Sequence, residues 1–154
     1  MSTLRQITVL QLYAFLNGQP RDSFASAGDF RKLMGALKET EKQLGEYLKE
    51  YVKHELAVGK LMRPYRDKSI AAGEDKSQLS KIQLEADADK EVQKTVKAWE
   101  EFQKKENEKP LEFAIKNPEY ALFVKNLLEK DALKFKGWLS NNVIEDLFDH
   151  FEIK

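Results

Sequence analysis

Apolar side chains recur every seven residues through the first half of the chain, and this repeat constrains the fold more than any other feature. The repeat consists of Phe30, Leu37, Leu44, Tyr51 and Val58. Sevenfold spacing keeps an apolar stripe on one side of an α-helix and favours packing against a second helix at about 20°. We therefore expect a long helix at about residues 26–62, capped by Ser23 or Ser26. Pro64 should end it, because proline has no amide hydrogen for a helix.

A second apolar stripe supplies a partner for this helix, at about residues 78–106. It reads Leu79, Ile82, Ala86, Val92, Val96, Trp99 and Phe102. Asp89 is a polar residue at a core-like position of this stripe. Residues 65–77 have the polar, glycine-containing composition of a loop, which we expect to be mobile. The first helix is mainly basic and the second mainly acidic, so charge favours their pairing. The two stripes predict a long antiparallel helical hairpin.

Shorter elements precede and follow the hairpin in the sequence. Residues 3–7 alternate weakly and are a candidate edge strand, followed by a helix that Thr8 caps and Gly18 ends; one helix over residues 4–16 is the alternative. Residues 111–115 alternate with the period of two typical of a strand and are a candidate partner for residues 3–7.

The C-terminal part, residues 111–154, should add two helices to this strand. Asn117 caps the first, residues 134–137 turn, and Ser140 caps the second. We predict one mainly α-helical domain over residues 1–154, in which shorter helices pack on the hairpin and a two-stranded β ribbon is a further candidate element.

Composition narrows the class of protein. The 154 residues include 26 basic and 26 acidic side chains, which leave no net charge to attract nucleic acid or anionic membranes. No apolar run approaches the roughly 18 residues that cross a bilayer, and the first 16 residues lack a signal-peptide pattern, so we expect a cytoplasmic protein without a membrane partner. The absence of cysteine excludes disulfides, thiolate metal sites and cysteine nucleophiles.

Catalytic and metal-binding patterns are incomplete. His54 and Glu55 begin like the helical zinc-protease signature, but Val58 stands where the second histidine is required. A C-terminal cluster could hold a divalent ion, although a solvated acidic helix end is the interpretation that we favour; it consists of Asp146, Asp149, His150 and Glu152. The seven glycines are scattered and form no phosphate-binding loop. We therefore expect no enzyme, no cofactor and no metal site.

Two surfaces are candidates for binding. A hairpin buries each helix on one side only, so leftover apolar residues favour a homodimer or a second protein. The candidates for this interface are Tyr47, Val52, Leu56 and Leu84. Nucleic acid is the alternative partner, because cations bind phosphates and an aromatic ring stacks on a base. The candidates for this contact, at the predicted hairpin tip, are Lys60, Arg63, Tyr65, Arg66 and Lys68.

Three segments resemble small proteins of unknown function from tailed phages and prophages of Gram-positive bacteria. They are residues 27–34 (AGDFRKLM), residues 111–115 (LEFAI) and residues 143–152 (VIEDLFDHFE). The resemblance implies a phage-encoded protein that acts in a bacterial host cell, and it implies no catalytic residues. We therefore expect a non-enzymatic protein that binds a phage or host protein in virion assembly or in modulation of the host. A nucleic-acid-associated regulator is the alternative.

Overall fold

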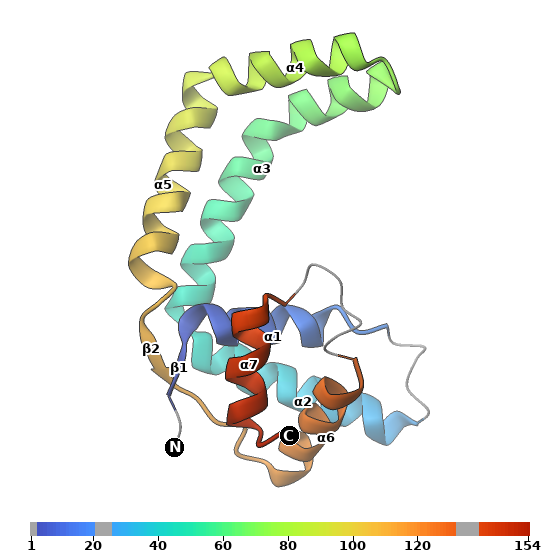
Figure 1. Ribbon diagram of the computed structural model, residues 1–154, viewed down its shortest axis with the longest axis vertical. Coiled ribbons are helices and arrows are strands. Elements are labelled where there is room, and N and C mark those ends of the chain that lie inside the picture. The colour runs from blue at the N-terminus through green and yellow to red at the C-terminus, as the bar shows by residue number, and fades with distance from the viewer. Residues whose placement is uncertain (1–2, 21–25, 132–138) are drawn as a thin grey trace. The chain divides into compact units, whose positions relative to one another are not determined.

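The computed structural model describes residues 3–20, 26–131 and 139–154 and confirms a mainly α-helical fold with one small antiparallel sheet (Figure 1). The chain divides into two compact units where the sequence led us to expect one domain. Met1–Leu48 and Asn107–Lys154 form the first, which we call the core unit, and Lys49–Glu106 form the second, the hairpin unit. The elements are β1 (Thr3–Arg5), α1 (Gln6–Asn17), α2 (Ala27–Leu44), α3 (Glu46–Ala72), α4 (Lys76–Ala88), α5 (Lys90–Glu106), β2 (Pro110–Glu112), α6 (Pro118–Asp131) and α7 (Asn141–His150).

The core unit is built around α1, which packs against α2 and α7, while α2 also packs against α6. Its largest fully buried side chains are Phe15, Phe113, Leu12, Leu16, Leu128 and Leu147. Gly35 lets α2 approach α6 closely, because a Cβ at this position would lie only 2.2 Å from the ring of Tyr120. The core therefore depends on close packing between residues that are distant in the sequence.

The predicted pairing of the two strand candidates is confirmed, but both strands are shorter than expected. β1 and β2 are antiparallel, with Leu4 opposite Leu111. Beyond β2, Phe113 and Ile115 are buried, and the amide of Ala114 donates to Gln43 Oε1 while its carbonyl accepts from Gln43 Nε2. A side chain of α2 thus replaces the neighbouring strand here, which explains why the alternating pattern extends beyond the sheet.

The prediction that Thr8 caps the first helix is wrong. α1 begins at Gln6, and its first amides donate to the carbonyls of Lys109 and Asn107 at 2.9 and 3.0 Å. Thr8 is fully buried inside α1, so a distant segment of backbone performs the capping role.

The predicted caps at three other helices are confirmed. Side-chain oxygens of Ser26, Asn117 and Ser140 accept amide hydrogens of the first turns of α2, α6 and α7. The alternative cap Ser23 and the predicted turn at residues 134–137 lie outside the described residues. Capping depends on neighbours in sequence, which is why local patterns located these helix starts.

A helical hairpin is present, but its first arm is not the predicted helix over residues 26–62. That span is divided at Gly45, whose positive φ of 54° ends α2, and α3 then continues to Ala72. Pro64 lies within α3 rather than ending it, so most of the predicted loop at residues 65–77 is helical. The turn between the arms contains Gly73, which has a φ of 63°. Packing of one face of α3 against the second arm outweighs the intrinsic cost of a proline in a helix, about 3 kcal/mol.

The second arm also differs from the predicted helix over residues 78–106, because it is divided at Asp89 into α4 and α5. The Asp89 carboxylate accepts the amide hydrogens of Glu91 and Val92, which open α5. The polar residue within the apolar stripe is therefore a helix cap, in accordance with the preference of aspartate for that position.

Candidate functional site

Aromatic contacts join the two arms of the hairpin at the end away from the turn at Gly73. The rings of Tyr51 and Trp99 meet edge to face with centroids 5.6 Å apart. His54 packs on Phe102 at 4.9 Å, so the histidine of the incomplete protease signature belongs to the face that joins the arms. Tyr51 of α3 contacts Trp99, whereas Lys68, farther along α3, contacts Glu85. The residue numbers thus rise along one arm and fall along the other, which confirms that the arms are antiparallel.

The regular helical hydrogen bonding is interrupted in both arms, at positions that lie next to each other. Pro64 removes the amide that would donate to the carbonyl of Lys60, and the next residue, Tyr65, donates its hydroxyl to Asp89 Oδ2 at 2.5 Å, at the break between α4 and α5. This hydrogen bond raises the pKa of the Tyr65 hydroxyl and lowers that of the Asp89 carboxyl. Figure 1 shows both arms bending in the same direction, with α3 on the inside of the bend.

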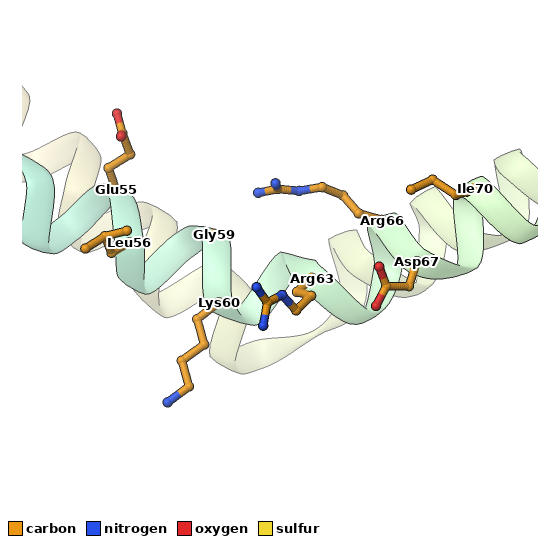
Figure 2. A pocket seen from close by; sticks show the side chains of 8 residues that line it. All are labelled: Glu55, Leu56, Gly59, Lys60, Arg63, Arg66, Asp67 and Ile70. Atoms are coloured by element: carbon orange, nitrogen blue, oxygen red, sulfur yellow. The ribbon is translucent and has the colours of Figure 1, made fainter.

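The inside of this bend is hollowed. The hollow has a volume of about 590 Å³ and is lined entirely by α3 (Figure 2). We call it the concave face; its residues are Glu55, Leu56, Gly59, Lys60, Arg63, Arg66, Asp67 and Ile70. Figure 2 shows the Arg66 side chain extending back along the helix toward Gly59, with Glu55 and Lys60 on opposite edges. The concave face therefore combines exposed apolar side chains with a central group of cations.

The structure gathers three of the five candidate nucleic-acid contacts. Lys60, Arg63 and Arg66 line the concave face. Tyr65 instead bonds to Asp89, and Lys68 Nζ lies 3.6 Å from Glu85 Oε2 and 5.6 Å from the centre of the Tyr65 ring. Tyr65, the predicted stacking residue, is thus directed to the other arm of the hairpin.

The candidate interface residues also separate into two groups. Tyr47 is not an exposed apolar residue, because it is buried in the core unit and its hydroxyl donates to Asn107 Oδ1 at 2.6 Å. Val52, Leu56 and Leu84 are exposed to 38%, 66% and 69%. Leu56 lines the concave face and Val52 lies one turn before it on the same side of α3, whereas Leu84 is on α4.

Ile70 is the residue that sequence reasoning missed. It is exposed to 78% and lies at the far end of the concave face. The composition of residues 65–77 predicts a loop, which places Ile70 on no helix face. Its spacing from Leu56, which equals two sevenfold repeats, is the signal that could have identified it if Pro64 had been allowed inside a helix.

One of the C-terminal acidic residues, Asp146, forms part of a network in the core unit. Asp146 Oδ2 accepts hydrogen bonds from Arg5 Nη2 at 2.8 Å and from Thr8 Oγ1 at 2.7 Å, and Arg5 also pairs with Glu108 at 3.2 Å. Burial opposes ionisation of Asp146, but the hydrogen bonds from Thr8 and Arg5 outweigh it and lower the pKa of the carboxyl. Asp146 therefore joins β1, α1 and α7.

Other groups near Asp146 line a second hollow of about 440 Å³ in the core unit, which includes Asp149, His150 and Glu152. The His150 ring lies 5.5 Å from that of Phe113 and 4.9 Å from that of Phe151, and burial lowers its pKa. Within residues 3–20, 26–131 and 139–154, no three histidine, aspartate or glutamate side chains are grouped so that they could hold a metal ion. The aromatic contacts make His150 a packing residue of this unit.

Among the helices that the structure describes, none is both long and apolar enough to span a bilayer. No protein-family model matches the chain, and neither a curated protein nor a solved structure gives a significant match.

Proposed function

We propose that the chain is a non-enzymatic protein-binding module and that its hairpin unit contacts another protein through α3. The observation that carries this proposal is the distribution of large exposed apolar side chains. Of five such residues in the described part of the chain, only Leu122 lies outside the hairpin. The other four are Val52, Leu56, Ile70 and Leu84, of which the first three lie on α3. Exposed apolar groups concentrated on one element are typical of an interaction surface.

The architecture of the hairpin supports the same proposal. In the described residues of this unit, Ala86 and Val92 are the only apolar residues that are buried. Two helices cover one face of each other and leave the remaining faces in water, whereas stable domains bury apolar faces between packed layers. A protein partner on α3 would supply the missing layer.

The partner in this proposal is a phage or host protein in an infected bacterial cell, bound during virion assembly or modulation of the host. Support for this setting comes from the resemblance of residues 27–34, 111–115 and 143–152 to phage and prophage proteins. A second copy of the chain would cover the same apolar residues, and a homodimer is therefore one outcome of the tests below.

Nucleic acid is the second candidate partner, favoured by the three cations of the concave face. Glu55 and Asp67 line the same face, however, and would repel phosphates. None of the eight residues that line the face is aromatic, so the face has no ring on which a base could stack. These features favour a protein partner.

Site-specific photo-cross-linking tests the proposal. Leu56 is replaced by benzoylphenylalanine in cells that make the protein naturally, and Lys38, an exposed residue of α2 in the core unit, is replaced in the control. We expect a discrete protein adduct at position 56 and none at position 38. Absence of an adduct at position 56, or the same adducts at both positions, would contradict the proposal. An adduct with nucleic acid would establish the second candidate instead.

A further inference from the structure

α3 carries two stripes of side chains, each with alternating spacings of three and four residues. One stripe includes Tyr51, His54 and Tyr65, whose side chains contact Trp99, Phe102 and Asp89 of the second arm. The other stripe is turned away from the second arm and consists of Val52, Leu56, Gly59, Arg63, Arg66 and Ile70. Such spacing is that of a coiled-coil seam, which packs against another helix. One stripe of α3 therefore contacts the second arm, and the other faces away from it. We call the second stripe the open seam.

We infer that the open seam of α3 binds an acidic amphipathic α-helix of another protein. The inference rests on the proposed function and names the class of partner. The seam is apolar at both ends, where Val52, Leu56 and Ile70 are exposed, and cationic in the middle, where Arg63 and Arg66 lie. Glu55 and Asp67 also line the concave face beside the seam, so partner carboxylates are favoured only directly against the two arginines. A complementary helix therefore carries carboxylates in its middle and apolar residues toward both ends.

The middle of the seam also has room for a helix backbone. Gly59 has no side chain, and the nearest group to the position of a Cβ there is the guanidinium of Arg66, at 3.6 Å. Arg66 is an exposed, flexible side chain that extends over Gly59 in Figure 2, where its guanidinium could meet a carboxylate of the partner. The seam from Val52 to Ile70 is about 27 Å long at ~1.5 Å per residue, which matches a helix of about 20 residues.

A second copy of the chain fits this seam less well. Parallel pairing would place Arg63 against Arg63 and Arg66 against Arg66. Antiparallel pairing of Val52 with Ile70 would place Arg66 against Leu56 and Glu55 beside Asp67. Both arrangements oppose like charges or bury a cation against an apolar residue, which disfavours association.

Three synthetic helical peptides of about 20 residues test the inference by fluorescence anisotropy with the full chain at about 150 mM salt. The first has leucines at the outer seam positions and glutamates in the middle, the second has lysines in the middle, and the third keeps the glutamates but has serines in place of leucines. We expect the first peptide to bind about tenfold or more tightly than the other two. Equal binding of the first two peptides would overturn the inference.

Charge reversal locates the contact. The double variant Arg63→Glu/Arg66→Glu should weaken binding of the acidic peptide by about tenfold or more and strengthen binding of the lysine peptide. The matched control, Lys94→Glu/Lys97→Glu, makes the same change of charge on exposed residues of α5 and should alter binding less than about twofold. Circular dichroism should show that both variants are folded. An equal loss of binding in the two double variants would overturn the inference.

The remaining outcomes distinguish this inference from the proposed function. A protein adduct at position 56 in cells, without binding of the acidic peptide, would leave the proposed function intact and overturn the acidic-helix partner. Displacement of the acidic peptide by an equimolar single-stranded oligonucleotide would assign the seam to nucleic acid. Sedimentation of the chain as a dimer that Leu56→Glu dissociates would assign the seam to a second copy. Each of these last two results also overturns the inference.

Discussion

The two units of the chain are both helical, but different forces stabilise them. In the core unit, α1 is enclosed by other elements, and Val9, Leu12 and Phe15 have no exposed surface. In the hairpin unit, the arms are held by half-buried aromatic contacts such as Tyr51 with Trp99 and by polar contacts such as Tyr65 with Asp89. The comparison indicates that the core unit derives its stability from burial, whereas the hairpin unit leaves most of its side chains in contact with solvent.

The largest effect should follow from Phe15→Ala in the core unit. Removal of a fully buried ring leaves a cavity, and we expect the free energy of unfolding to fall by about 3 to 5 kcal/mol, measured by urea denaturation. Leu56→Ala is the control, because the side chain is 66% exposed and its removal should change the free energy by less than about 0.5 kcal/mol. Similar losses in both variants would remove the distinction between the units.

Trp99→Ala should have a smaller effect, confined to the hairpin. The ring is only partly buried, so we expect a loss of about 2 kcal/mol, seen as faster hydrogen exchange in α3 and α5. Trp99→Phe should lower the free energy of unfolding less, since it keeps an aromatic ring beside Tyr51. It also removes Nε1, the one buried polar side-chain atom without a hydrogen-bond partner among the described residues. Equal acceleration of exchange in α1 would show that the two units unfold together.

Two glycine-to-alanine substitutions, one in each unit, should change the free energy of unfolding in opposite directions. Gly35→Ala places a methyl group against Tyr120, and we expect a net loss of about 1 to 2 kcal/mol in thermal or urea unfolding. Gly59→Ala meets only ordinary contact with Arg66 and should stabilise α3 by about 0.5 to 1 kcal/mol. In a Tyr120→Ala background, Gly35→Ala should no longer destabilise the protein. Persistence of the loss in that background would contradict the packing explanation.

The smallest effect should be the pH dependence that His150 confers on the core unit. Burial lowers the pKa of His150 below 6.5, so the unfolded chain takes up a proton more readily than the folded chain as the pH falls through this region. The free energy of unfolding should therefore be lower at about pH 5.5 than at about pH 7.5, measured by urea denaturation, and His150→Gln should reduce the difference. A wild-type stability that is unchanged between these pH values would contradict this.

Local patterns predict the helical class, the pairing of β1 with β2 and three helix caps. They also brought Lys60, Arg63 and Arg66 to attention, and Leu56 as an exposed apolar residue. They misplace Tyr47, because a tyrosine on an amphipathic helix can be either exposed or buried. Asn107, whose Oδ1 accepts the hydrogen bond from the Tyr47 hydroxyl, is 60 residues away. Ile70 escapes local patterns for the same reason, since the contacts that keep α3 helical beyond Pro64 come from the second arm.

The heptad spacing and the short-range caps are properties of the sequence itself, because each depends on residues within a few turns of one another. They determined that the chain forms long amphipathic helices and where several of those helices begin. Tertiary structure decided that Gly45 separates α2 from the hairpin, that α3 continues through Pro64 and that the face of α3 inside the bend is open. The continuation of α3 through Pro64 depends on contacts with the second arm, such as Tyr65 with Asp89, which no pattern of neighbouring residues contains.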